Sequence, residues 1–283
     1  MEFAGRARLA GAIRLIHPFP SLLDGLVVAG IAIVATGEWP TAVRLGISMT
    51  ALQASIGSLN DLVDAPTDAG RKPGKPIPAN LVSLPAAKAM VVGAAGLGIA
   101  SAVPSGLALV ALAAVVLGIG YGYDLLAKGT AWSWLPFAVG IPLLPLYGWL
   151  GAAGTVPGWF AALLPMAVLA GTALAIANAS ADVERDLAAG IGSIATHLGL
   201  ERAWWADLGL VLAALALAVG WLAMAGHLQG AAGSLVALGT PLVGIGLALS
   251  RGSAADLRER GWQVQAIGIA VIGTGWVWAA AGA

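Results

Sequence analysis

Long apolar stretches alternate with short polar segments along the whole chain. Nine of these stretches come close to the roughly 20 mainly apolar residues that a helix needs to cross a bilayer. They lie at 13–37, 41–59, 84–103, 105–123, 131–151, 157–178, 202–225, 232–250 and 262–282. Apolar and polar residues do not alternate with the period of two that marks membrane strands. The pattern therefore predicts an all-α polytopic membrane protein with nine transmembrane helices, in one domain over residues 1–283.

The first two stretches are the weakest, since Asp24 interrupts the first and Arg44 and Gln53 dilute the second. Composition still supports a membrane protein: 59% of residues are hydrophobic and 10% are charged, whereas a soluble domain carries roughly 25% charged residues. The chain has no cysteine, which excludes disulfides and thiolate zinc sites. The hydrophobic composition predicts membrane lipid around the protein, and the net charge of zero predicts no nucleic acid partner.

The positive residues predict the orientation, because cytoplasmic loops carry an excess of Lys and Arg. These residues gather before the first stretch and after the second, fourth, sixth and eighth: Arg6, Arg8, Arg14, Arg71, Lys72, Lys75, Lys88, Lys128, Arg185, Arg202, Arg251, Arg258 and Arg260. Only Arg44 falls on the opposite side. We therefore expect a cytoplasmic-membrane protein whose N-terminus is cytoplasmic and whose C-terminus lies outside.

One polar pattern, Asn-x3-Asp-x3-Asp, occurs twice and ends the second and the sixth stretch. The two copies are Asn60, Asp64 and Asp68, and Asn178, Asp182 and Asp186. On a helix this spacing places the three side chains on one face, a turn apart. Each copy precedes a polar cytoplasmic loop. The repeated placement predicts two related halves, with the second and sixth spans facing each other across a central cavity.

Carboxylate and amide oxygens beside apolar spans are costly unless a cation gathers them. Mg²⁺ prefers such oxygens and completes its coordination with phosphate oxygens and water. We therefore predict that the two motifs hold Mg²⁺ ions bridged by a diphosphate. Asp61 is either a supporting ligand or a partner of Arg71. The cations that can contact the diphosphate, or merely mark the cytoplasmic side, are Arg71, Lys72, Lys75 and Lys128.

A diphosphate joined to a long hydrocarbon fits this location, with its headgroup at the cytoplasmic rim and its tail between helices. Loss of diphosphate from an allylic carbon leaves a carbocation, which an enclosed site protects from water and which alkylates a neighbouring acceptor. Asp24 either contacts that acceptor or pairs with Arg14 or another buried polar group. Gln53 and Ser58 are candidates to line the pocket. No histidine has ligand partners at a useful spacing, so we assign none to metal.

The motif-bearing segments resemble the UbiA superfamily of intramembrane prenyltransferases over nearly the whole chain. LNDLVDAPTD matches the NDxxDxxxD motif of that family, and DVERD matches its DxxxD second motif. KPIPANLVS resembles the basic-Pro-Ile-Pro stretch after the first motif, and RLIHP resembles the Arg-Pro start of the first helix. The resemblance implies nine helices around a central cavity, Mg²⁺-dependent activation of a polyprenyl diphosphate, and prenyl transfer to a lipophilic, typically aromatic, acceptor.

The resemblance also implies roles for further residues. Tyr123 and Lys128 resemble the catalytic Tyr/Lys pair after the fourth helix, although an interface anchor and a snorkelling cation are the alternatives. The second motif departs from the family pattern: Leu187 follows Asp186 where a basic residue is usual, and GIGSIATHLG lacks the usual cation. The resemblance then implies Arg185 as the substitute for the diphosphate contact. Lys75 stands where the family more often has Arg.

Two other functions compete with a prenyltransferase of the quinone or lipid biosynthesis type. A terpene cyclase of the same architecture uses the same metal motifs, and only its products differ. A cation-coupled transporter also uses Asp pairs, but its coupling sites lie near the membrane midplane, whereas these motifs run into cytoplasmic loops. A CDP-alcohol phosphotransferase is disfavoured, because its DG-x2-AR core is absent.

Overall fold

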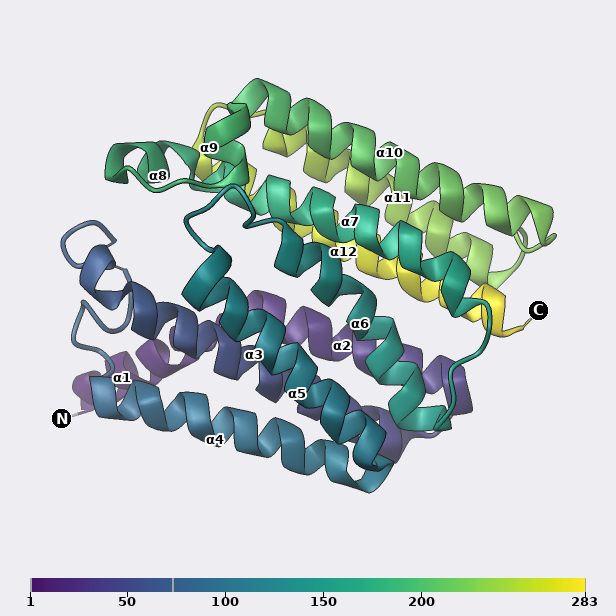
Figure 1. Ribbon diagram of the computed structural model, residues 1–283, viewed down its shortest axis with the longest axis horizontal. Coiled ribbons are helices and arrows are strands. Elements are labelled where there is room, and N and C mark those ends of the chain that lie inside the picture. The colour runs from purple at the N-terminus through teal and green to yellow at the C-terminus, as the bar shows by residue number, and fades with distance from the viewer. Residues whose placement is uncertain (1, 73, 283) are drawn as a thin grey trace. The chain divides into compact units, whose positions relative to one another are not determined.

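The computed structural model describes residues 2–72 and 74–282, and these residues form helices and no strand. Figure 1 shows the elements in order. Their bounds are α1 Glu2–Leu15, α2 Pro18–Thr36, α3 Trp39–Asp68, α4 Leu84–Ala102, η1 Val103–Ser105, α5 Leu107–Gly122, η2 Tyr123–Ala127, α6 Leu135–Ala153, α7 Phe160–Ala181, α8 Val183–Ala189, α9 Ile194–Leu198, α10 Leu200–Met224, α11 Ala231–Ser250 and α12 Ala255–Ala281. This confirms the predicted all-α class.

The chain divides into two compact units. The first comprises the chain up to Leu126 together with Tyr147–Gly154, and the second comprises Ala127–Leu146 and the chain from Thr155 onward. Each unit contains one copy of the acidic motif, on α3 and at the end of α7. The prediction of related halves that face each other, and of one domain over residues 1–283, stays a prediction.

Eight of the described helices are long and apolar enough to cross a membrane: α2, α4 with η1, α5 with η2, α6, α7, α10, α11 and α12. The count of nine is not confirmed, because the predicted span 41–59 lies inside α3, which is not among the eight. Its polar residues are satisfied by neighbouring helices. Arg44 donates to the carbonyl of Ser101 at 2.6 Å, and Ser48 donates to the carbonyl of Gly98 at 2.6 Å.

The predicted first span, 13–37, begins too early. The chain breaks between α1 and α2, where His17 adopts a left-handed backbone conformation with φ 48° and ψ 68°. Pro18 then starts α2, as expected for a residue that lacks the backbone N–H and has a helical φ. The apolar pattern runs through this break, so it could not locate the boundary.

In the first unit, α3 packs against α2, α4 and α5 (Figure 1). Small residues allow the close approach of α2 and α3. A Cβ on Gly25 would lie 2.8 Å from the carbonyl oxygen of Gly46. That distance is shorter than a Cβ atom tolerates, so only glycine fits at this position. Close backbone contact through small residues is the usual way in which membrane helices associate. The first motif is therefore carried by the most enclosed helix of this unit.

In the second unit, α7 packs against α10 and α12, and α11 packs along α12 (Figure 1). The α7 helix also approaches the first part of α6, since a Cβ on Gly171 would lie 2.4 Å from the carbonyl oxygen of Phe137. Both motif-bearing helices are thus surrounded by helices of their own unit, which gives the carboxylates rigid support.

We expect Gly246→Ala to destabilise the second unit. An added Cβ would lie 2.7 Å from the backbone nitrogen of Gln265 and 2.7 Å from the carbonyl oxygen of Gly261, and overpacking of this kind costs about 1–3 kcal/mol. Thermal unfolding in detergent measures the effect. Gly244→Ala on the same helix is the matched control, because its Cβ would enter open space. Equal melting temperatures of the two variants would contradict the close α11–α12 packing.

Candidate functional site

The first acidic motif lies on one continuous helix, as predicted. Asn60, Asp64 and Asp68 all belong to the last three turns of α3, so their side chains lie along one face. Asp68 is buried, whereas Asn60 and Asp64 are partly exposed. The helix continues past Pro66 to Asp68 and keeps the spacing of the motif intact.

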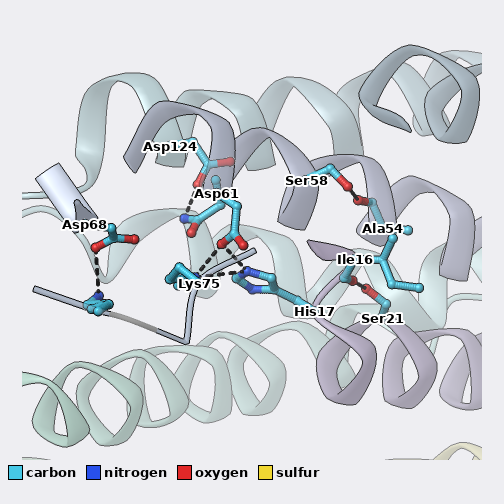
Figure 2. A network of polar contacts seen from close by, with 11 residues as sticks. Ile16, His17, Ser21, Ala54, Ser58, Asp61, Asp68, Lys75 and Asp124 are labelled. Carbon is cyan, nitrogen blue, oxygen red and sulfur yellow. Dashed lines mark hydrogen bonds and ion pairs between the residues drawn. The ribbon is translucent and has the colours of Figure 1, made fainter. Parts of the chain in front are cut away.

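Asp61 is the centre of a polar cluster with His17 and Lys75, which point toward one another in Figure 2. The ring of His17 donates from Nε2 to Asp61 Oδ1 at 2.7 Å, and Lys75 Nζ donates to the same oxygen. Asp61 is only 2% exposed. The predicted partner Arg71 is therefore wrong: Arg71 is exposed, while Lys75 reaches Asp61 from the loop after α3.

Asp61 lies beyond the predicted span 41–59, and burial and neighbouring charges have opposite effects on the pKa of its carboxyl. Burial alone would raise the pKa of its carboxyl. The hydrogen bond and charge of His17, with those of Lys75, outweigh burial and lower the pKa of Asp61 below its ordinary value. The cluster therefore holds an ionised carboxylate, which fixes Lys75 of the loop beside the first acidic motif.

His17 is a site residue that the sequence reasoning missed. Its left-handed backbone ends α1 and directs its ring toward α3, where Gly57 leaves room: a Cβ there would lie 3.0 Å from His17 Cβ. Asp61 follows Gly57 by one turn and accepts the hydrogen bond. The available signal was local, because a residue before proline is disfavoured in a helix and histidine is among the residues enriched at positive φ.

Asp124 was also missed. It is buried within η2, a turn of π-helix after α5, and is labelled in Figure 2. Its carboxylate accepts a hydrogen bond from Asn60 Nδ2 at 2.7 Å. This bond orients the amide of Asn60, so that its oxygen is left for a ligand. π-Helical turns are frequent at functional sites. The signal in the sequence was an aspartate at the apolar end of the fourth stretch.

The donors of the first motif fit a hard cation. Oδ2 of Asp61 and Oδ2 of Asp68 are buried and have no hydrogen-bond partner within the described residues. The other oxygen of Asp68 lies 3.6 Å from Lys72 Nζ. Among the described residues no three His, Asp or Glu side chains are close enough to hold a metal by themselves. The unpartnered carboxylate oxygens are themselves of the kind that Mg²⁺ takes, one or two at a time, together with phosphate and water.

The second motif does not lie on one helix, contrary to the prediction. The α7 helix ends at Ala181, and Asp182 has φ −106° and ψ 2° before α8 begins at Val183. Asn178 thus belongs to α7 and Asp186 to α8. Arg185 forms an ion pair with Asp182. The i, i+4 spacing could not report this break, because it arises from contacts made far along the chain.

Those contacts come from Arg258 of α12, which in the sequence is only one of the positive residues that indicate the orientation. It is 1% exposed. Its Nε donates to the carbonyl of Ser180 at 2.8 Å, and its Nη1 donates to the carbonyls of Gly252 and Ser253 at 3.1 and 2.6 Å. Nη2 donates to Glu184. Arg258 therefore satisfies the last turn of α7 and holds the start of α8, which positions Asp182 between them.

The remaining predicted residues lie near the ends of these helices. Tyr123 begins η2 and Lys128 follows it, and both are partly buried. Their catalytic roles stay predictions. The same holds for the diphosphate contacts predicted for Arg71, Lys72, Lys75 and Arg185. Gln53, a candidate pocket residue, donates to Asp24 at 2.7 Å. A pairing with a buried polar group is one of the two alternatives for Asp24.

Comparison with known proteins agrees with this architecture. The sequence model of the UbiA prenyltransferase family matches residues 25–267. No curated protein matches the chain at a significant level.

Solved structures with the same fold include an apo UbiA homolog from Aeropyrum pernix K1, with a TM-score of 0.73, 20% identity, and coverage of 92% of this chain and 97% of that chain. A UbiA homolog from Archaeoglobus fulgidus bound to GPP and Mg²⁺ has a TM-score of 0.71 and 20% identity, covering 93% and 99%. A digeranylgeranylglyceryl phosphate synthase has a TM-score of 0.70 and 15% identity, covering 98% and 99%.

Proposed function

Because this chain belongs to the UbiA prenyltransferase family, we propose that it transfers a prenyl group from a polyprenyl diphosphate to a lipophilic acceptor, with Mg²⁺ as cofactor. The observation that carries the proposal is the first motif on α3, where two buried carboxylate oxygens lack a protein partner. Homologs of the same fold from Archaeoglobus fulgidus were solved with GPP or DMAPP and Mg²⁺, which supports the choice of donor and metal.

We assign metal binding to Asp64 and Asp68 with Asn60, and to Asp182 and Asp186 with Asn178. When bound, Mg²⁺ neutralises the diphosphate and makes it a better leaving group. Asp61 is a supporting residue, since its Oδ1 holds Lys75 and His17 while its Oδ2 has no protein partner.

Lysine and arginine side chains near the two motifs are the contacts that we assign to the diphosphate. Lys75 is held at the motif by Asp61, and Lys72 lies beside Asp68, which supports our assignment of both to contact the diphosphate. Arg71 and Arg185 are the further candidates. We assign Tyr123 and Lys128 to stabilise charge that develops as the carbon–oxygen bond breaks.

An aromatic or lipid acceptor of the quinone or lipid biosynthesis type is the acceptor class that we propose, supported by the digeranylgeranylglyceryl phosphate synthase of the same fold. Eight apolar helices and the family indicate an integral membrane protein. We place it in the cytoplasmic membrane with the N-terminus and the site cytoplasmic and the C-terminus outside, following the distribution of Lys and Arg. A cyclase of this fold is the second candidate, since its metal site is the same.

Purified protein in detergent or nanodiscs tests the proposal. Geranyl, farnesyl and geranylgeranyl diphosphate are supplied with Mg²⁺ and a panel of hydroquinone, 4-hydroxybenzoate, 1,4-dihydroxynaphthalene, 1,4-dihydroxy-2-naphthoate and a glycerol-based lipid alcohol. Diphosphate release and lipid products are followed by mass spectrometry. An acceptor adduct supports a transferase, whereas a cyclic hydrocarbon or alcohol without an adduct supports the cyclase.

Metal removal is the companion prediction. We expect EDTA to abolish diphosphate release and added Mg²⁺ to restore it, because the carboxylates of the motif cannot neutralise a diphosphate on their own. The same preparation kept with Mg²⁺ throughout is the control. Undiminished release in EDTA would refute the metal-dependent mechanism.

A further inference from the structure

A pair of polar side chains lies inside the first unit, away from the acidic motif. Gln53 of α3 donates from Nε2 to Asp24 Oδ2 of α2 at 2.7 Å. Both side chains are partly buried, and α2 is one of the helices suited to cross the membrane. A carboxyl group at such a position is expensive and usually marks a substrate path or a functional site.

The pair does not face lipid. Leu22 and Leu26 form the exposed apolar side of α2. Asp24 is two residues from each, which on a helix is a rotation of about 200°. It therefore lies on the opposite side of α2, next to the buried side that carries Ser21 and Gly25.

The oxygen atoms of the pair that are not used in the Gln53–Asp24 hydrogen bond define what the pair can bind. The amide nitrogen of Gln53 is used on Asp24, so its amide oxygen remains, together with the second oxygen of Asp24. Neither side chain forms another side-chain hydrogen bond within the described part of the chain. Two acceptor oxygens on partly exposed side chains call for a ligand that brings hydrogen-bond donors.

The second unit contains a pair of the same chemistry that cannot serve a ligand. Gln265 of α12 donates to Asp207 of α10 at 2.7 Å, but these residues are 0% and 1% exposed. That pair is a buried link between helices. The comparison shows that an Asp–Gln contact alone does not require exposure, and that the Asp24–Gln53 pair is the accessible one.

The position of the pair connects it with the motif. Gln53 precedes Asn60 by seven residues, so both lie on one face of α3, separated by about 10 Å along the helix axis. Two hydrogen bonds link the start of α2 to α3. The His17–Asp61 bond lies nearer the C-terminal end of α3, and the Asp24–Gln53 bond lies about two turns farther from that end. The Asp24–Gln53 pair therefore lies about two turns of α3 before Asn60, on the helix face that carries the proposed metal ligands.

We propose that Asp24 and Gln53 form the binding site for the polar end of the prenyl acceptor, and that this acceptor carries neutral hydrogen-bond donors such as hydroxyl groups. This inference rests on the proposed prenyl transfer. A carboxylate at the corresponding position of an acceptor is disfavoured, because it would bring further acceptor oxygens against two that already lack donors. The site therefore selects a dihydroxy aromatic compound or a lipid alcohol over an aromatic acid.

Asp24→Asn tests the proposal, because it keeps the size of the side chain and replaces an acceptor oxygen by a donor. With the donor and acceptor that the wild-type protein uses best, we expect the KM for the acceptor to rise about tenfold and the KM for the prenyl diphosphate to stay unchanged. Asp207→Asn is the matched control and should change neither. An unchanged acceptor KM, or equal rises for both substrates, would overturn the acceptor site.

A measurement on the wild-type protein keeps the test independent of the folding of the variant. Hydroquinone is compared with 4-hydroxybenzoate, and 1,4-dihydroxynaphthalene with 1,4-dihydroxy-2-naphthoate. A higher kcat/KM for the neutral member, or use of the lipid alcohol alone, supports the site, and a preference for the acids overturns it. Diphosphate release without any adduct also overturns it, while leaving the donor site in place. No release from any donor would instead overturn the proposed function itself.

Discussion

We expect Asp64→Ala and Asp182→Ala each to lower the rate of diphosphate release by about 100- to 1,000-fold, the scale on which the loss of one electrostatic stabiliser acts. Asp64 shares a helix face with Asn60 on α3, and Asp182 stands at the α7–α8 junction. A carboxylate at each position holds Mg²⁺ in the proposed mechanism, so its loss leaves the diphosphate leaving group without compensation of charge. Mass spectrometry of the products in Mg²⁺-containing nanodiscs measures the loss.

The same two variants should keep their fold, because Asp64 and Asp182 are partly exposed and a surface substitution changes stability by only about 0.5 kcal/mol. Asp256→Ala supplies the matched control: this exposed carboxylate begins α12 outside both motifs, and its variant should retain full activity. Full activity in both motif variants would refute the assignment of these carboxylates as metal ligands. A loss of melting temperature parallel to the loss of activity would point to a structural role.

The second large effect is expected for Arg258→Met. This substitution keeps much of the apolar volume but removes every donor that the side chain offers to Ser180, Gly252, Ser253 and Glu184. Loss of a charged donor to a buried acceptor costs about 1.5–3 kcal/mol per bond, and breaking a buried ion pair by removing one partner costs about 3–5 kcal/mol. Of these acceptors only Ser180 belongs to a buried residue. Gly252 is partly exposed and Ser253 and Glu184 are exposed, so water replaces most of their loss, and we expect about 3 kcal/mol in total.

Thermal unfolding of the purified variant in detergent measures this effect. Arg260→Ala is the comparison, because Arg260 lies on the same helix but is exposed and should change stability by no more than about 0.5 kcal/mol. Mg²⁺ binding by the second motif should weaken in Arg258→Met at temperatures where the variant is still folded, since the α7–α8 junction loses its support. A melting temperature equal to that of Arg260→Ala would contradict the role of Arg258.

Much of the helical frame follows from local pattern. The predicted stretches 84–103 and 232–250 match α4 Leu84–Ala102 and α11 Ala231–Ser250 within one residue at each end. The reason is that a run of about 20 apolar residues in a bilayer has few alternatives to a helix. Spacing alone also placed the first motif correctly on one helix face, because α3 continues through it.

The breaks in the helices depend on partners distant in the chain. His17 leaves helical geometry where Gly57 and Asp61 of α3 receive its ring. The second motif bends at Asp182, where Arg258 takes the carbonyl of Ser180. No periodicity within either segment contains this information, since the residues that decide it are 44 and 78 positions away.

The chain's own order of residues therefore determines its class, most of its spans and the oxygen-rich motifs that point to Mg²⁺ and a diphosphate. Packing determines which polar residues meet: Asp61 with Lys75 rather than Arg71, Asn60 with Asp124, and Gln53 with Asp24. Hydropathy is a property of each segment and can be read one segment at a time. A hydrogen bond between helices depends on the rotation and register of both, and these exist only once the helices have packed.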